Sequence, residues 1–470
     1  MATDHRKGSL GTLKNPVRDL RSYLEANADV VTHIGRPVHL DDVGALAAQS
    51  DRPIVFENII ERPGFRLCDS LVKTRAMHGR TLGVAPEDFC KTLAARIRRP
   101  PRPTVVSERG PVKEVVLTGT EVDLGRLPVA YHTDRDDVPF LTGMCIIKDP
   151  ETGFLNTSHP LSRVEGPRRC TSSFFTPHAN AVMAKYRAMG AHEMPMAMCI
   201  GLHPAYEIVG NFSGLHMDMW GEIDMIGAVM EQDVELTRCE TIDLLVPAHA
   251  EIVIEGMVNL VDRFSARQSG GPVPYFIPGT TNNPEWNITA ITMRRDRPIY
   301  RNHQMVPSAT DHQRLFLLCH EAVLYNRLAE SGLDVRDVQF PVWGGTLTVL
   351  LQFDYPRPGM VNDALMLVMG SPWPQTKVVI AVSPDTDIND PEAVFLAVAS
   401  RCDPSRDMIL VPNCKAYRFD PSAELLPNHY PQRIVGKIGI DATVKERYNK
   451  ADFELAWPRN WGKVFLKDYL

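Results

Sequence analysis

Helical and extended patterns of apolar residues alternate along the first hundred positions of the chain. Helical spacing predicts helices over residues 19–25, 39–48, 69–81 and 85–97. A short apolar run at 52–57 predicts a strand between them. Helices that alternate with strands are typical of an α/β domain, and the proline cluster near residue 100 interrupts the pattern. We therefore expect an N-terminal α/β domain over residues 1–110.

From residue 112 the pattern changes to short apolar runs separated by turn residues. These runs predict strands at 115–117, 141–147, 197–200, 234–236, 244–246, 250–254 and 287–292. Two stretches with helical spacing, 181–189 and 223–230, interrupt them. Strands spaced by turns favour a barrel-like β domain, which we place over residues 111–310.

The last third of the chain returns to an α/β pattern. A helix is expected from Asp311, strands at 347–353 and 377–382, and a helix over 391–400. They predict a C-terminal α/β domain over 311–470. Aromatic residues recur in the tail from Ala451, which we interpret as a docked terminal segment that takes part in assembly.

Composition narrows the class of protein. Charged residues make up 23% of the chain and hydrophobic ones 44%, as in ordinary globular proteins. A net charge of -6 without a run of Lys or Arg argues against nucleic-acid binding. Nine scattered cysteines without a C-x-x-C pair indicate free thiols in a reducing compartment. No signal-like or membrane-spanning apolar run is present, so we expect a cytoplasmic protein.

One stretch of the middle domain concentrates polar residues after a turn. An apolar run over 140–147 is followed by Asp-Pro-Glu-Thr-Gly at 149–153, which is typical of a tight turn. A second extended run follows and carries Asn156, Ser158 and Arg163. A hairpin that places polar groups just past its turn can support a small-molecule site.

The chain lacks the common nucleotide and hydrolase motifs, including G-x-G-x-x-G, the P-loop, H-E-x-x-H and G-x-S-x-G. Asn156, His178 and Glu222 remain as candidates in the middle domain. An amide oxygen, an imidazole and a carboxylate form a mixed set that suits Mn²⁺, Mg²⁺ or Fe²⁺ better than structural zinc. On the residues alone, the ordinary interpretation is favoured over a metal site: a turn residue, a helix cap and a first-turn acid.

Several longer stretches resemble a known family. They are Glu121-Val-Asp-Leu-Gly-Arg-Leu-Pro128, Asp149-Pro-Glu-Thr-Gly153 with Asn156-Thr-Ser158, Glu193-Met-Pro-Met-Ala-Met-Cys-Ile-Gly201, Glu240-Thr-Ile-Asp-Leu-Leu-Val-Pro-Ala248, Glu251-Ile-Val-Ile-Glu-Gly256 and Gly439-Ile-Asp-Ala-Thr443. In this order they resemble the UbiD-like family of reversible decarboxylases, which use prenylated flavin mononucleotide. The resemblance extends over most of the chain. It implies a central split β-barrel that binds the flavin between two α/β domains.

The resemblance also implies a cofactor site. In the family an Asn, a His and a Glu hold the cofactor phosphate through a divalent metal, and they fall on Asn156, His178 and Glu222. The metal would be Mn²⁺, or Mg²⁺ or Fe²⁺, with K⁺ as a further ion. Thr157 and Ser158 would lie against the cofactor. Lys377 would reach its phosphate.

The usual catalytic residues of the family are replaced in this sequence. The Arg and the two Glu fall on Leu161, Ala266 and Gly271. If the segment after the turn is one strand, His159 and Arg163 point in the same direction as Leu161. Arg163 could then enter the pocket, and His159 could donate a proton near neutral pH. Arg267 is another candidate.

We therefore expect a decarboxylase of an aromatic, heteroaromatic or α,β-unsaturated acid, including an aromatic acyl-CoA of the phthaloyl-CoA type. A flavin prenyltransferase would supply the cofactor, and the enzyme would form a homodimer or homohexamer. Two alternatives stay open: a flavin-binding carboxylase subunit or silent paralogue, and a metal-dependent lyase or hydrolase without flavin.

Overall fold

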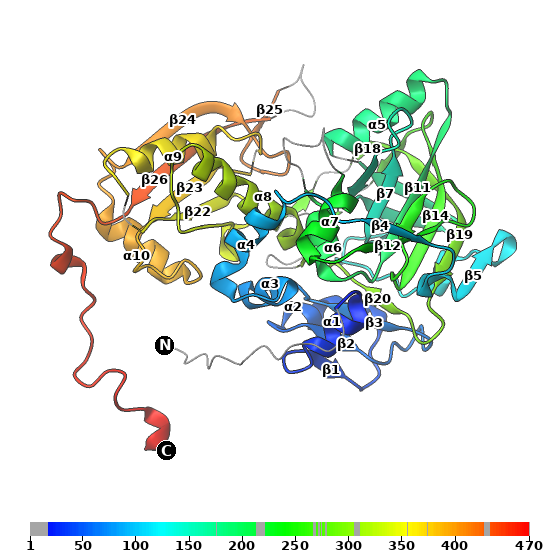
Figure 1. Cartoon of the computed structure of the whole chain (residues 1–470), viewed down its shortest axis with the longest axis horizontal. Helices are drawn as coiled ribbons and strands as arrows, with labels where there is room; N and C mark the ends of the chain where they lie inside the picture. The colour runs from blue at the N-terminus through cyan, green and yellow to red at the C-terminus, as the bar shows by residue number, and fades with distance from the viewer. Residues whose placement is uncertain are drawn as a thin grey trace.

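The chain folds into three regions arranged around one long helix (Figure 1). The computed structural model describes residues 17–174, 176–212, 221–266, 269–270, 273, 275–277, 280–304, 311–354, 356–373, 375–426 and 433–469. The N-terminal region is blue in Figure 1, the central β region is cyan to green, and the C-terminal region is yellow to orange. Helix α8 (Asp311–Glu330) connects the central and C-terminal regions.

The N-terminal region is a small sheet covered by helices. Its strand order is β1 (Thr32–Ile34), β2 (Ile54–Phe56), β3 (Arg66–Asp69) and β20 (Ile299–Arg301). Its helices are α1 (Leu20–Ala26), α2 (Val43–Ala48), α3 (Arg75–Leu82) and α4 (Phe89–Arg96). Strand β20 comes from far along the chain and pairs in parallel with β3. The N-terminal sheet is therefore completed by residues that the sequence assigned to the middle domain.

The helix predicted over 69–81 is wrong in its first half. Asp69 ends a strand, and α3 begins only at Arg75. The Thr74 side chain caps this helix by accepting the N–H of Met77. Gly83, at a φ of 70°, ends it.

The central region is built on a large antiparallel sheet. The strand order is β6-β9-β10-β19-β14-β11-β7-β8, with β5 added beside β19. The strands are β5 (Val115–Thr118), β6 (Phe140–Leu141), β7 (Met144–Lys148), β8 (Leu155–Ser158), β9 (Leu161–Gly166), β10 (Arg169–Ser173), β11 (Glu193–Ile200), β14 (Ile252–Asn259) and β19 (Glu285–Met293). Both faces of this sheet are buried: along β14, Ile252 and Ile254 pack into one apolar core and Val253 into another.

The sheet must curl, because its two ends are joined by the chain itself. β8 is at one end of the strand order and β9 is next to the other end, yet only His159 and Pro160 separate them in sequence. Three Cα steps span at most about 11 Å, so the two ends of the sheet lie side by side. This curled sheet agrees with the barrel-like domain predicted from the sequence.

Smaller elements surround the curled sheet. They are β4 (Thr104–Ser107), β12 (Val234–Arg238), β13 (Leu245–Pro247), β15 (Phe264–Ala266), β16 (Ser269–Gly270), β17 (Phe276–Ile277), β18 (Thr280–Asn283), α5 (Pro177–Ala188), α6 (Pro204–Val209) and α7 (Glu222–Met230). β4 pairs in parallel with β12, so the central region takes in residues from Thr104 onward, before the boundary we expected at 110. The two predicted helices at 181–189 and 223–230 correspond to α5 and α7.

The C-terminal region is an α/β sheet with three parallel strands and antiparallel edges. The strands are β21 (Asp337–Gln339), β22 (Thr348–Gln352), β23 (Val378–Val382), β24 (Met408–Lys415), β25 (Glu424–Leu425) and β26 (Arg433–Ala442), and the helices are α9 (Met360–Met369) and α10 (Pro391–Arg401). β22, β23 and α10 confirm the predicted strands and helix. α9, β24 and β26 were not predicted from the sequence.

The tail after residue 450 runs away from the C-terminal sheet (Figure 1). Its large apolar side chains are exposed to solvent, among them Leu455, Trp457, Trp461, Phe465, Leu466 and Tyr469. The rings of Trp457 and Trp461 stack on each other with centroids 5.0 Å apart. The tail was expected to be docked, and within one copy of the chain it is not.

Two expectations from composition can be compared with the described residues. All nine cysteines are free thiols, as the sequence predicted. Among the described helices, none is long and apolar enough to cross a membrane.

Buried charges fix the junction of the three regions. Asp311, at the start of α8, is completely buried and pairs with Arg301 at the end of β20. It also accepts the backbone N–H groups of Leu71 and Val72. Arg301 lies 3.4 Å from Glu207 of α6. One ion-pair network therefore joins the N-terminal sheet, the central region and α8.

We predict that Asp311→Asn lowers the free energy of unfolding by about 3–5 kcal/mol, because it leaves the Arg301 guanidinium buried without its closest charge. The comparison is Asp354→Asn, which removes the partner of Arg336 at an exposed ion pair and should change stability by at most about 0.5 kcal/mol. Urea unfolding measures both. Equal effects of the two substitutions would refute a structural role for the buried pair.

Candidate active site

Asn156 and Glu222 meet at the edge of the curled sheet. Asn156 lies on β8, and Glu222 is the first residue of α7, which packs beside β8. The Asn156 Nδ2 group donates to Glu222 Oε1 at 3.1 Å, and the backbone N–H of Thr157 donates to Glu222 Oε2 at 3.2 Å. Helix α7 starts here because the Asp224 side chain accepts the N–H of Gly221. The first turn of the helix thereby holds the Glu222 carboxylate against β8.

This buried carboxylate has no cationic partner among the described residues. Burial raises the pKa of Glu222 to about 8, with hydrogen bonds from Thr157 and Asn156 opposing the shift. Nearby, Asn156 Oδ1 and Ser158 Oγ are buried without a hydrogen-bond partner in the described chain. Carboxylate, amide and hydroxyl oxygens are the ligands that hard divalent cations prefer. The residues present therefore fit a metal ion that would compensate the Glu222 charge.

His178 is close in the fold but is not joined to this pair. It is the second residue of α5, is half-buried, and has its pKa lowered by burial, which favours the neutral imidazole that binds metals. α5 packs beside β8, and its Lys185 binds Asp149 of the turn before that strand at 2.6 Å. Within the described residues His178 forms no hydrogen bond to Asn156 or Glu222, and no three His, Cys, Asp or Glu side chains gather as a metal site.

A second polar cluster surrounds His159, which the connection between β8 and β9 carries into the interior. The rings of His159 and His303 are 5.8 Å apart between centroids in an edge-to-face arrangement. His303 Nε2 lies 2.9 Å from Glu207 Oε1. His303 and Glu207 are buried, His159 is half-buried with both ring nitrogens shielded from solvent, and burial raises the pKa of Glu207. A carboxyl group whose protonated form is favoured therefore faces an imidazole.

This environment corrects the role expected of His159. Burial lowers its pKa to about 3, with the charge of His303 as the next cause. The ring is therefore neutral near pH 7 and does not carry a proton as an imidazolium. Glu207 and His303 were not predicted from the sequence. Burial raises the pKa of Glu207, which is the opposite of its effect on His159. No local pattern marks Glu207 and His303, because they come from α6 and from the segment after β20.

Arg163 lies on β9, and the expectation that it shares one strand with His159 is wrong. Pro160 lacks the N–H that would continue the strand, and β8 and β9 pair with different neighbours. The Arg163 guanidinium is buried, 2.5 Å from Asp137 and 3.2 Å from Glu165. Its Nη1 has no hydrogen-bond partner among the described residues. One buried donor of this arginine therefore remains available to an anion.

The remaining candidates lie elsewhere or outside the described residues. Lys377, just before β23, binds Asp420 at 2.7 Å and Ser422 at 2.5 Å within the C-terminal region. Arg267 and Gly271 lie outside the described residues, and only the backbone of Ala266 is described, at the end of β15. Leu161 packs against Phe140.

Two family models match the chain and together define its class. Residues 104–308 match the Rift-related domain of 3-octaprenyl-4-hydroxybenzoate carboxy-lyase, and residues 313–442 match the C-terminal domain of the same enzyme. An uncharacterised protein of Archaeoglobus fulgidus is 30% identical over 358 residues, which are 74% of this chain and 70% of that protein. The chain belongs to the UbiD family, and it is a decarboxylase.

Relatives with a stated activity and solved structures agree with this class. The anhydromevalonate phosphate decarboxylase of Methanosarcina mazei is 26% identical over 93% of this chain and 98% of its own length. The UbiD-class enzyme HmfF of Pelotomaculum thermopropionicum, solved with FMN, has a TM-score of 0.86 at 28% identity and covers 96% of this chain and 100% of that one. Its evolved dimeric form, solved with prenylated FMN, has a TM-score of 0.82 at 26% identity, with the same coverage.

We predict that Glu222→Gln abolishes stabilisation of the protein by Mn²⁺, because the amide removes the charge that a cation would neutralise. The thermal midpoint should rise with Mn²⁺ in the wild type and stay constant in the variant. Glu285→Gln is the matched control, since Glu285 pairs with Arg169 on the same sheet. A wild-type midpoint that does not respond to Mn²⁺, or a variant that responds equally, would contradict Glu222 as a metal ligand.

Proposed function

We propose that the protein catalyses non-oxidative decarboxylation of an α,β-unsaturated, aromatic or heteroaromatic carboxylic acid, with prenylated FMN and a divalent metal as cofactors. The observation that carries this proposal is the buried Asn156–Glu222 pair, beside which the described part of the chain places no cation. The FMN and prenylated FMN bound in HmfF support the choice of cofactor. The two relatives named anhydromevalonate phosphate decarboxylase support decarboxylation of a small acid.

Asn156, His178 and Glu222 would hold the metal and, through it, the cofactor phosphate. Thr157 and Ser158 would line the cofactor, and no described residue accepts from the Ser158 hydroxyl, which leaves it available to donate. Lys377 could reach a phosphate only after leaving Asp420. The bound flavin would supply an electron sink for the carbanion that decarboxylation creates.

The chain's own residues would provide the positioning and the proton. Nη1 of Arg163 would bind the substrate carboxylate, since its other contacts leave this donor unpaired. The bond between the carboxylate carbon and the adjacent carbon of the substrate then breaks, and carbon dioxide is released. Glu207 would give its proton by way of His303 to the carbon left behind, and His159, whose ring packs edge-on against that of His303, would hold His303 in position. Solvent would restore the Glu207 proton, so the reaction consumes one proton and forms one C–H bond.

We predict that protein produced together with a flavin prenyltransferase, and supplied with Mn²⁺, exchanges substrate hydrogen for deuterium on a member of a panel of unsaturated acids, aromatic acids and aromatic acyl-CoA thioesters. Purified protein should carry the flavin spectrum. If it contains flavin and no acid in the panel exchanges, the silent-paralogue alternative is favoured. Protein that turns over an acid without flavin would instead support a metal-dependent lyase.

Substitutions test the roles proposed for single residues. Glu207→Gln should reduce hydrogen–deuterium exchange by about 10²–10⁴-fold while the flavin stays bound, because the amide cannot supply the proton. Arg163→Ala should mainly raise the substrate concentration needed for half-maximal rate, since it removes a carboxylate ligand. Arg169→Ala, at an exposed arginine of the neighbouring strand β10 that pairs with Glu285, is the control. Full activity of Glu207→Gln would exclude the proposed proton path.

We further propose that the enzyme is a homo-oligomer in which the tail covers a second copy of the chain. The apolar side chains from Leu455 to Tyr469 form a larger exposed set than a soluble monomer normally presents to water. Evolved HmfF is described as dimeric, so a closely similar fold does self-associate. Identical copies offer a repeated surface that can bury both tails symmetrically.

We predict that a chain ending at residue 454 has a lower mass in solution than the full chain. The folded regions should remain intact, because the tail makes no part of the apolar cores. Light scattering after size-exclusion chromatography gives the mass, and a double substitution, Trp457→Ser with Trp461→Ser, tests the same point without truncation. An unchanged mass for both proteins would contradict assembly through the tail.

A further inference from the structure

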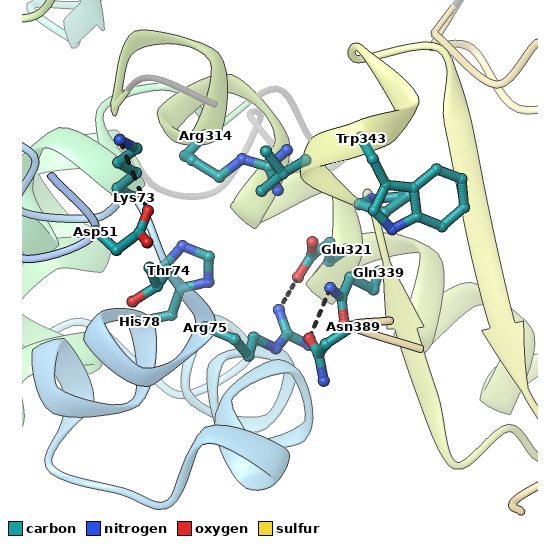
Figure 2. A pocket seen from close by; sticks show the side chains of 12 residues that line it. Asp51, Lys73, Thr74, Arg75, His78, Arg314, Glu321, Gln339, Trp343 and Asn389 are labelled. Carbon is teal, nitrogen blue, oxygen red and sulfur yellow. Dashed lines mark hydrogen bonds and ion pairs between the residues drawn. The ribbon is translucent and has the colours of Figure 1, made fainter. Parts of the chain in front are cut away.

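A cavity of about 200 Å³ lies between the N-terminal region, α8 and the C-terminal region (Figure 2). The N-terminal region contributes residues around α3, α8 contributes two charged side chains, and the C-terminal region contributes the short helix at Val342–Gly344. It is lined by Asp51, Lys73, Thr74, Arg75, His78, Arg314, Glu321, Gln339, Pro341, Val342, Trp343 and Asn389. None of these residues belongs to the proposed cofactor or catalytic groups.

Arg314 is the unusual feature of this cavity. Its side chain is 2% exposed, and Nη1 donates to the backbone oxygen of Phe340 at 2.5 Å. Nε and Nη2 have no hydrogen-bond partner among the described residues. Burial lowers the pKa of Arg314 to about 10, so the guanidinium stays charged near neutral pH. A buried charge with two unused donors is costly unless a ligand satisfies it.

Glu321 is the carboxylate whose charge acts on Arg314, and it is already bound to other groups. Glu321 pairs with Arg75, which also binds Asp337 at 3.1 Å, and it accepts the N–H of Phe340 at 2.9 Å. Figure 2 shows Arg75 and Glu321 pointing toward each other while Arg314 extends above them. Arg314 therefore faces the cavity without a counterion of its own among the residues that the structure describes.

The balance of charge indicates what the cavity would accept. The buried charges around it are three cationic side chains, Lys73, Arg75 and Arg314, and two anionic ones, Glu321 and Asp337, while the Asp51 side chain is exposed. The Lys73 ammonium is satisfied by the backbone oxygens of Ala48 and Ser50. One positive charge is left over, on Arg314. A ligand with a single negative charge matches this surplus better than a phosphate group of charge near −2.

The unused hydrogen-bonding atoms define the ligand further. Nε and Nη2 form the edge of a guanidinium that binds both oxygens of a carboxylate. His78 Nε2 is bound to the Val72 oxygen at 2.8 Å, which leaves Nδ1 as an acceptor, and Nδ1 has no partner among the described residues. Gln339 Oε1 is likewise unused. These acceptors call for a donor on the ligand, such as a hydroxyl group.

We propose that this cavity is a binding site for a small hydroxylated carboxylic acid, whose carboxylate pairs with Arg314 and whose hydroxyl donates to His78 or Gln339. Trp343, 40% exposed at the cavity, offers an apolar surface for the body of such a molecule. A ligand bound here contacts α3, α8 and the C-terminal region at once, so its occupancy stabilises their mutual arrangement.

The test is isothermal titration of the full chain with 3-hydroxybenzoate, benzoate and inorganic phosphate at matched ionic strength. We expect 3-hydroxybenzoate to bind more tightly than benzoate, and phosphate to bind more weakly than either. Arg314→Gln should weaken 3-hydroxybenzoate binding at least tenfold. Arg336→Gln, at an exposed arginine paired with Asp354, should leave binding unchanged. Equal affinities of wild type and Arg314→Gln would overturn the proposal, as would tighter binding of phosphate.

Two further variants keep the outcome clear. If Arg314→Gln does not fold, Arg314→Lys retains the charge but lacks the paired donors, so it should also weaken binding. Binding at the proposed catalytic site would instead be lost in Arg163→Ala and kept in Arg314→Gln. That result would assign the ligand to the decarboxylation site and overturn the cavity as its binding site, whereas loss in the Arg314 variants alone would support the cavity even if no acid is decarboxylated.

Discussion

The rest of the structure depends on the interactions of the buried Arg301 guanidinium with two carboxylates. Arg301 ends the strand that completes the N-terminal sheet, pairs with Asp311 at the start of α8, and lies 3.4 Å from Glu207 of α6. A charge buried to this extent is tolerated only while its partners stay in place. The position of α8, and with it the C-terminal region, is therefore tied to the sheet that carries the candidate site. Because Glu207 also faces His303, the same carboxylate serves both the fold and the proposed proton path.

Two buried glutamates with different surroundings divide the candidate site into two functions. Glu222 has amide and backbone donors but no cation among the described residues, and burial raises its pKa to about 8. Glu207 has His303 2.9 Å away, and burial raises its pKa although the charges of Arg301 and His159 oppose the shift. A carboxylate that lacks a counterion is suited to bind a metal, and one that faces an imidazole is suited to exchange a proton. Different environments thus give the same side chain two separate tasks.

The sequence predicted the elements that depend on local pattern. β22, β23 and α10 are continuous apolar or amphipathic segments, so their spacing alone identifies them. The strand at Arg66–Asp69 was not predicted, and its last residue was assigned to a helix, because one of its partners, β20, lies more than 200 positions away. Pro160 was a signal of the break between β8 and β9 that the sequence reading did not use. The contact of Asn156 with Glu222 agrees with a family resemblance, whereas Glu207, His303 and Arg301 meet only through tertiary folding, which no periodicity encodes.

If Leu161 takes the place of the family's arginine, as the resemblance implies, the geometry of β9 has a consequence for Arg163. Residues two apart on a strand lie on the same face, and both Leu161 and Arg163 contact the ring of Phe140. The step between them is about 6.6 Å along the strand, which is close to the reach of an extended arginine side chain. The Arg163 side chain is therefore long enough to extend back toward the position that Leu161 occupies. Asp137 and Glu165 hold the guanidinium from one side, and Nη1 has no partner among the described residues. An arginine placed two residues further along the strand would therefore still reach the proposed pocket.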